Sequence, residues 1–168
     1  MRLFKVASVL AITAGLTLAT APQNPPRSAS DSVRGHFVSV NRRVLEMAKD
    51  FPEDKYDFRL KPEMRSFGAV IVHIASGNVY AARAGRGENV NWDELEPENY
   101  KTKAAVVVLL EKSITDANAT IKGLPDASFG KSVEPWLSVT EHTAEHYGLL
   151  VAYYRANGLV PPASRPKK

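Results

Sequence analysis

Apolar residues recur along this chain at steps of three and four positions, which is the spacing of one face of an α-helix. No segment sustains the alternation of polar and apolar residues that marks a half-buried strand. The pattern predicts four helices, at about 32–50, 67–84, about 101–122 and from about 135 to 156. Four helices without repeats in one small domain predict an all-α fold, a four-helix bundle. The long connections leave the up-and-down order of the helices open.

Several helix ends carry signals of their own. Ser66 precedes the second helix as an N-cap. The last helix begins near Pro135 or at a capping box formed by Ser138 and Glu141. Asn157-Gly158, followed by two prolines, ends it. The second helix is apolar almost all round, so we expect it to be buried.

The first 21 residues differ from the rest of the chain. Arg2 and Lys5 make a short basic start, and the 16 residues VASVLAITAGLTLATA that follow carry no charge. A basic start, an apolar stretch and a small-residue exit are the parts of a secretory signal peptide, with cleavage after Ala19 or Ala21. An uncleaved membrane anchor is the alternative, but this run is short for a span. We expect a signal peptide at 1–21, a linker at 22–31, a four-helix domain at 32–165, and a periplasmic or secreted protein.

Composition and charge limit the chemistry. With 44% hydrophobic and 24% charged residues, the 168 residues are enough for one domain with its own core. Removing Arg2 and Lys5 from the 22 basic residues leaves 20 against 18 acidic ones, spread along the chain, so we expect no nucleic-acid partner. The chain has no cysteine. This excludes a lipid-anchored lipoprotein, and any metal site must use nitrogen and oxygen ligands.

Two of the four histidines share one face of the last helix. Steps of three and four from Val139 lead through His142 and His146 to Tyr153, so we expect both imidazoles to point into the bundle. Side chains at i and i+4 lie about 6 Å apart at Cβ, close enough to bind one metal ion. The alternative is that a tyrosine or a carbonyl satisfies each imidazole, because an unpaired polar group in a core costs on the order of 1–3 kcal/mol.

A third metal ligand must come from another part of the chain. The segment from His142 through Glu145 to His146 reads H-x-x-E-H, the inverted zinc-protease motif. No acidic residue follows His146 to supply the glutamate ligand of such proteases, and the domain is far too small for their fold. His73 lies in the middle of the buried second helix. The sequence therefore predicts a three-nitrogen metal site of His73, His142 and His146 between two helices, with His36 at the surface.

Other conspicuous residues near this site allow more than one interpretation. Glu145 is the candidate catalytic base, but it lies about 100° round the helix from His146. A salt bridge, or a supporting contact behind the metal ligands, is the alternative. We interpret Gly77 and Gly148 as positions of close helix packing, and Trp92 as a packing residue.

Three features occur together in this sequence: a helix entered by RSFGAVIVHIA, an H-x-x-x-H on the last helix, and the ending EHYGLLVAYYRANGLVPPASR. In these features the chain resembles the DinB-like superfamily. One branch of that superfamily often ends HYG…YxRxxGxxPP, and the resemblance covers about 32–165. It implies a bundle of up-down-down-up type and a divalent metal held by three histidines, which map onto His73, His142 and His146. Members include thiol-dependent transferases and isomerases of the cytosol, and the apparent export signal departs from that pattern.

Two functions are therefore expected. One is an exported metal-dependent hydrolase or group transferase acting on a small molecule, with zinc or nickel as the metal and manganese or iron as alternatives. The other is a non-catalytic metal-stabilised bundle or partner-binding module. An enzyme needs an open coordination position beside a pocket, which a sequence does not show. We expect no stable membrane span once the leader is removed, and a homodimer is compatible with a small bundle.

Overall fold

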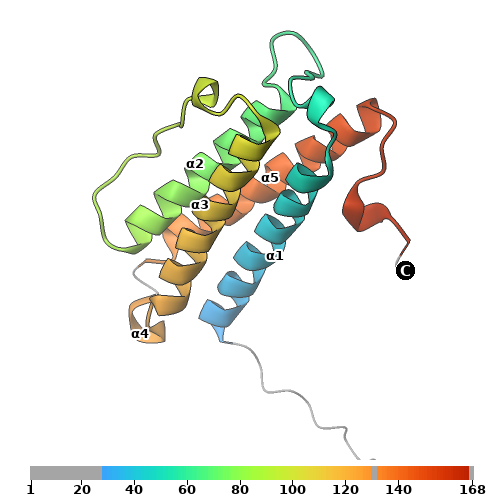
Figure 1. Cartoon of the computed structure of the whole chain (residues 1–168). Coiled ribbons are helices and arrows are strands. Elements are labelled where there is room, and N and C mark those ends of the chain that lie inside the picture. Colours follow the sequence, from blue (N-terminus) through green and yellow to red (C-terminus); the bar gives the residue numbers. More distant parts are fainter. Residues whose placement is uncertain (1–27, 130–131, 167–168) are drawn as a thin grey trace, which may run out of the picture.

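The computed structural model of the chain describes residues 28–129 and 132–166 and is built from four long helices (Figure 1). These are α1 (Ala29–Asp50), α2 (Phe67–Gly85), α3 (Lys103–Gly123) and α5 (Glu134–Ala156). The shorter elements are η1 (Glu53–Lys55), η2 (Pro97–Asn99), α4 (Asp126–Phe129) and η3 (Pro162–Ser164). The described residues contain no strand, and the predicted all-α four-helix fold is confirmed. None of the helices described is long and apolar enough to cross a membrane.

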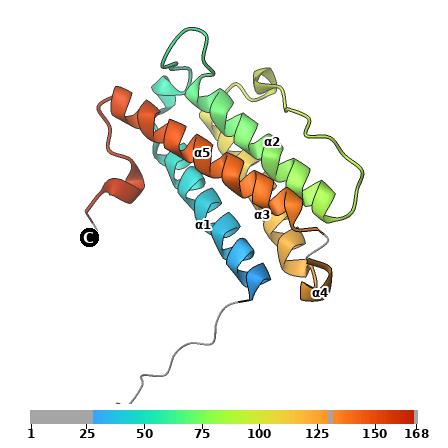
Figure 2. The ribbon, with the colours of Figure 1, turned by 180° about the vertical axis from the view of Figure 1, so that it is seen from behind.

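The helices α1 and α5 begin at one end of the bundle, whereas α2 and α3 begin at the other (Figures 1 and 2). Arg34, near the start of α1, donates to the carbonyl of Leu124 at the end of α3 over 2.6 Å. Trp136, at the start of α5, packs on Gly85 at the end of α2. The parallel course of α2 and α3 requires the long segment between them to return along the bundle, as Figure 1 shows.

The start of α1 lies slightly earlier than the pattern predicts. Ser28 caps the helix by accepting a hydrogen bond from the N–H of Asp31 at 3.0 Å. The helix thus takes in three residues of the segment assigned to a linker. Ser66 caps α2 as predicted, with the N–H of Ala69 donating to it at 3.2 Å. The predicted signal peptide at 1–21, and most of the linker, lie outside the described residues.

The start of α5 is Glu134, close to the first of its two predicted starts. The predicted capping box of Ser138 and Glu141 is wrong, because Ser138 lies inside the helix and its hydroxyl donates to the Glu134 carboxylate at 2.7 Å. At the other end, Gly158 has a φ of +69°, the left-handed conformation that commonly follows a helix.

The core divides into two clusters of buried side chains. One lies where α2 begins and contains Phe51 stacked on Phe67, with ring centroids 3.8 Å apart, and Tyr154. The other lies where α5 begins and is centred on Trp136, whose ring meets Phe37 edge-on at 5.4 Å. Burying each large apolar side chain contributes about 1.5–3 kcal/mol, so the bundle is held together at both ends.

Three buried polar side chains connect α1, α2 and α3 between these clusters. Asn78 of α2 donates to the side-chain oxygen of Asn41 on α1 at 2.8 Å and to the hydroxyl of Ser113 on α3 at 3.4 Å. Asn41 itself donates to the carbonyl of Phe37 at 3.2 Å. A buried polar group left without a partner costs about 1–3 kcal/mol, so this trio favours a single register of the three helices.

The C-terminal tail folds back onto the end of α1. Arg165 pairs with both carboxylate oxygens of Asp50, at 2.8 and 2.5 Å, and donates to the carbonyl of Val160. The hydroxyl of Tyr154 donates to the carbonyl of Met47 at 2.9 Å and contacts Asp50 at 3.1 Å. We call Asp50, Tyr154 and Arg165 the C-terminal clasp.

Candidate metal centre

Three of the four histidines meet between α2 and α5. His73 comes from α2, and His142 and His146 come from α5; their ring centroids lie 4.4–4.8 Å apart. The Nε2 atoms of His73 and His142 are 2.8 Å apart. One nitrogen from each ring lies within 4.8 Å of the other two. We call these residues the histidine cluster.

The histidine cluster lies beside the core and not within it. In this part of α5 the fully buried residue is Thr143, whereas His142 and His146 are half-buried. The two imidazoles therefore lie beside the core stripe of the helix and not on it as predicted. The side chain of His73 is 14% exposed. The cluster is consequently shielded from bulk water but reachable from one side.

All three imidazoles are held in the neutral form. Burial lowers the pKa of His142 to about 4, and charge on His146 and His73 acts in the same direction. Burial also lowers the pKa of His73 and of His146; the positive charge of Arg65 adds to this, while the negative charge of Glu94 opposes it. A neutral imidazole keeps a nitrogen lone pair, so each ring can act as a metal ligand at neutral pH.

One side of the histidine cluster is covered by the segment between α2 and α3, residues 86–102, which we call the strap (Figure 1). Its Trp92 stacks on Tyr80 of α2, with centroids 5.0 Å apart, and meets the ring of His142 edge-on at 4.7 Å. A Cβ on Gly77 would lie 2.5 Å from Cζ2 of Trp92 and 3.3 Å from Nδ1 of His142. Gly77 therefore makes room for Trp92 of the strap and, less closely, for His142 of the neighbouring helix α5.

The strap also brings a carboxylate to the histidine cluster. Oε1 of Glu94 lies 3.0 Å from Nδ1 of His73, close enough for a hydrogen bond but bent away from its best direction. Arg65 reaches both carboxylate oxygens of Glu94, at 2.9 and 3.0 Å. Burial alone raises the pKa of Glu94, but the hydrogen bonds and charges of Arg65 and His73 outweigh it and lower that pKa. Glu94 is thus an anion directly behind one of the three rings.

The other residues considered for this site lie at its edge or outside it. Glu145 is exposed on α5, and its negative charge opposes the lowering of the pKa of His146 by burial. Its role as a catalytic base stays a prediction. His36 is exposed on α1, outside the cluster. Gly148 is exposed, and a Cβ there would meet nothing within 4 Å, so its interpretation as a packing glycine was wrong.

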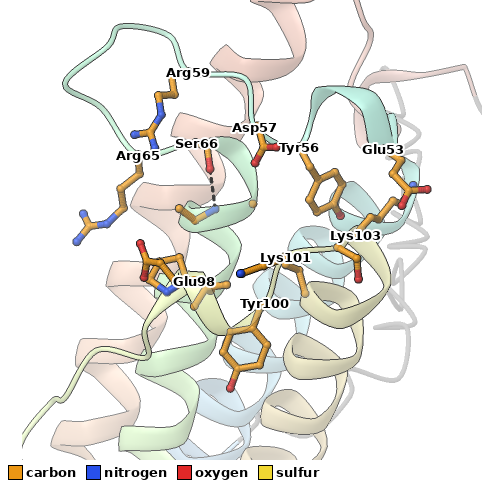
Figure 3. Close-up of a pocket in the computed structure, with 16 residues that line it drawn as sticks. Glu53, Tyr56, Asp57, Arg59, Arg65, Ser66, Glu98, Tyr100, Lys101 and Lys103 are labelled. Atoms are coloured by element: carbon orange, nitrogen blue, oxygen red, sulfur yellow. Dashed lines mark hydrogen bonds between the residues drawn. The ribbon is translucent and has the colours of Figure 1, made fainter.

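A pocket of about 640 Å³ lies at the end of the bundle where α2 and α3 begin (Figure 3). This volume is in the usual range for small-molecule sites, about 300–1,000 Å³. Figure 3 shows Arg59 and Arg65 on one side of the pocket and Lys103 beside Tyr56 on the other. None of the clustered histidines lines it, but Arg65 belongs to both regions, because it also pairs with Glu94.

The sequence analysis did not predict that Trp92 packs against the histidine cluster or that Glu94 brings a carboxylate to it. Helical periodicity locates residues on helices, and both of these lie in an irregular segment. The available signal was the length of that segment: connections longer than about 12–15 residues are uncommon and are often functional.

These observations define a class of protein: a small helical bundle with a three-histidine cluster compatible with metal binding. The model of the DinB superfamily matches residues 36–155, and the chain belongs to this superfamily. The match includes all three histidines of the cluster and the strap. No curated protein matches the chain by sequence.

Proposed function

We propose that this protein binds one divalent metal ion through His73, His142 and His146 and is a metal-dependent hydrolase or group transferase acting on a small molecule. The observation that carries the proposal is the convergence of three neutral ring nitrogens within 4.8 Å of one another. Membership of the DinB superfamily supports it. The pocket that shares Arg65 with the cluster supports the small-molecule substrate.

The residues of the histidine cluster fit such an ion. Among the described residues, buried Nδ1 of His142 has no hydrogen-bond partner. The Nε2 atoms of His73 and His142 lie 2.8 Å apart, at hydrogen-bond distance, so both point to the same position. Two nitrogen ligands of a tetrahedral zinc ion lie roughly 3.3 Å apart, so a small rotation of the rings accommodates one. Imidazole also suits nickel, manganese and iron, and zinc or nickel is our first choice.

A divalent ion on three imidazoles supplies a Lewis acid and lowers the pKa of a bound water. The surrounding residues determine what reaches that position. Neutral ligands leave the positive charge of the site undiminished, and Trp92 excludes water from one side. Arg65 places a guanidinium between the pocket and Glu94, where it attracts an anionic group of a substrate. We assign Glu145, beside His146 on the exposed side, as the candidate base.

Metal content is the first test of this proposal. Protein purified without a histidine tag should carry about one divalent ion per chain, measured by elemental mass spectrometry, and His73→Ala or His142→Ala should carry almost none. His36→Ala is the matched control, because His36 is exposed and lies outside the cluster. A metal-free wild type under metal-replete conditions, or full metal content in the two cluster variants, would overturn the assignment.

A non-catalytic, metal-stabilised bundle is the second candidate, favoured by the position of the cluster as a bridge between α2 and α5. Chelated and metal-reloaded protein should be compared on a panel of esters, amides and thiol-transfer substrates, and by thermal melting. Activity that returns with metal and is absent from His142→Ala supports the enzyme. A large metal-dependent rise in melting temperature without activity on any of these classes favours the structural role.

We also propose that the chain is exported, because its first 21 residues have the parts of a signal peptide. The full chain should be expressed in a bacterium and the periplasmic fraction analysed by intact mass. A product that has lost about 19–21 residues supports export. Full-length protein confined to the cytoplasmic fraction contradicts it.

A further inference from the structure

We propose that Glu94 is a positioning residue for metal binding: it holds the Nδ1 proton of His73, so that Nε2 of the same ring presents its lone pair to the ion. The inference rests on the proposed metal site and extends it to a residue outside the three histidines. It also gives the strap a task, because Glu94 is the strap's only carboxylate with a contact to the cluster among the described residues.

The two nitrogens of His73 face in different directions. Nδ1 lies 3.0 Å from Oε1 of Glu94, whereas Nε2 lies 2.8 Å from Nε2 of His142. A neutral imidazole carries its proton on only one nitrogen, and a carboxylate beside one nitrogen favours the proton there. The ring nitrogen toward the cluster is then free of its proton. A carboxylate behind a metal-binding histidine also makes the ring a stronger donor.

Glu94 is held in place by contacts outside the histidine cluster. Arg65 binds both of its carboxylate oxygens, and the hydroxyl of Tyr153 donates to the backbone carbonyl of Arg65. The next residue of the strap, Leu95, donates its N–H to the hydroxyl of Ser76 on α2 at 2.9 Å. The carboxylate is therefore fixed from both its side chain and its backbone, as a positioning group needs to be.

The same contacts argue against Glu94 as a fourth metal ligand. Both of its oxygens are engaged by Arg65, and Oε1 faces Nδ1 of His73, the nitrogen that points away from His142. Among the described residues, neither Nδ1 of His73 nor Nδ1 of His142 has a hydrogen-bond partner of good geometry, but Nδ1 of His73 lies beside a carboxylate. Glu94 is therefore a specific target for substitution.

Zinc affinity tests the inference. Purified full-length Glu94→Ala, Glu94→Gln and wild-type protein should be titrated with Zn²⁺ against a competing chelator. We expect Glu94→Ala to bind Zn²⁺ about 10–100-fold more weakly than wild type, the usual effect of removing such a partner. Glu94→Gln keeps an acceptor but loses the charge, so its loss should be smaller. Glu96→Gln is the matched control: its side chain is exposed in the same strap and has no ion pair or hydrogen bond with the described residues.

The protonation state of His73 provides a readout that a merely structural role would not move. In ¹⁵N NMR spectra of the zinc-loaded wild type, the His73 ring should carry its proton on Nδ1, and in Glu94→Ala that proton should exchange faster with water. Thermal melting of the metal-free proteins checks that each variant is folded. If Glu94→Ala is unfolded, the comparison is made with Glu94→Gln instead. Wild-type zinc affinity in the folded variants, or a His73 proton on Nε2, overturns the inference.

Failure of this inference is distinguishable from failure of the metal site. If His73→Ala still binds Zn²⁺ as wild type does, the proposed site is wrong. If His73→Ala loses Zn²⁺ while Glu94→Ala keeps wild-type affinity, only the role of Glu94 is wrong. Direct ligation by Glu94 would appear as a changed visible spectrum of the Co²⁺-loaded Glu94→Gln protein, and it too would overturn a positioning role.

Discussion

The two halves of α5 differ in the burial and hydrogen bonding of their polar side chains. In the first half, His142 and His146 are half-buried and face His73, and Nδ1 of His142 lacks a hydrogen-bond partner among the described residues. In the second half, Tyr153 and Tyr154 are fully buried, and each hydroxyl donates to a backbone carbonyl. The same helix therefore carries one polar cluster that lacks a hydrogen-bond partner and another in which each hydroxyl has one.

Under the proposed function, this difference separates residues that bind the metal ion from residues that stabilise the fold. A polar group that already has a hydrogen-bond partner contributes little free energy to the binding of a ligand. Histidine nitrogens that face one another can contribute much more when a cation binds between them. The family-like ending YYRANGLVPPASR belongs to the second kind, because Tyr154 and Arg165 fasten the tail to α1. We therefore expect variants of the two halves to separate metal binding from stability.

The largest effect should come from His142→Ala with zinc present. At a free zinc concentration 100 times Kd, binding stabilises the folded wild type by about 2.7 kcal/mol, and His142→Ala should lose all of this. Chemical denaturation with and without zinc measures it, and His36→Ala should behave as wild type. Equal zinc stabilisation of wild type and His142→Ala would remove the distinction between the two halves.

Gly77→Ala should cost about 1–3 kcal/mol of folding stability, the usual effect of overpacking. The added Cβ would lie 2.5 Å from Trp92, so the strap must shift away from the histidine cluster. Denaturant unfolding gives the stability.

The matched control for Gly77→Ala is Gly148→Ala on α5, where a Cβ would meet nothing within 4 Å. That change should stabilise the protein by about 0.5–1 kcal/mol, because alanine is favoured over glycine inside a helix. If both substitutions stabilise the fold, Gly77 is not a notch for Trp92.

Tyr154→Phe should destabilise the fold by about 1 kcal/mol, since it removes a buried hydroxyl whose single proton is shared between the carbonyl of Met47 and the carboxylate of Asp50. Zinc affinity should be unchanged, because the hydroxyl belongs to the C-terminal clasp. Tyr147→Phe, at a half-buried position whose hydroxyl makes no hydrogen bond with the described residues, is the control. A loss of zinc affinity in Tyr154→Phe would show that the two halves of α5 are coupled.

The smallest effect concerns acid. The hydrogen bonds from Arg165 lower the pKa of Asp50 below 3.8, although burial opposes them. Asp50 therefore binds a proton more weakly in the folded chain than in the unfolded one. Its contribution to stability is complete above about pH 4 and is lost as pH falls through the lowered pKa. The melting temperatures of wild type and Asp50→Asn should therefore converge as the pH falls below about 4; a constant difference would argue against the clasp.

Much of the fold was predictable because apolar periodicity and capping residues act locally. Ser66 and the stripe through Phe37 and Val44 are such signals, and they place α1 and α2 to within a few residues. The buried Asn41 was not predictable, because its partners Asn78 and Ser113 lie on two other helices. Hydrogen bonds between buried polar side chains of different helices leave no mark on the periodicity.

The histidines of the candidate site were predictable for the same reason, and their surroundings were not. His142 and His146 stand at helical spacing, and His73 stands inside an apolar helix. The predicted depth of His142 and His146 was wrong, because Thr143 between them is the residue that points into the core. Glu94 reaches the cluster through the course of the strap, which depends on tertiary contacts such as the one between Leu95 and Ser76.

The two tryptophans of the chain give it a natural optical reporter. Trp136 is completely buried in the cluster at the start of α5, out of reach of quenchers dissolved in water. Trp92 is partly exposed, with its ring 4.7 Å from that of His142. Emission from Trp92 should therefore fall when a paramagnetic ion such as Ni²⁺ or Co²⁺ binds, while emission from Trp136 stays nearly constant. Occupancy of the site can thus be followed by light, without any added dye.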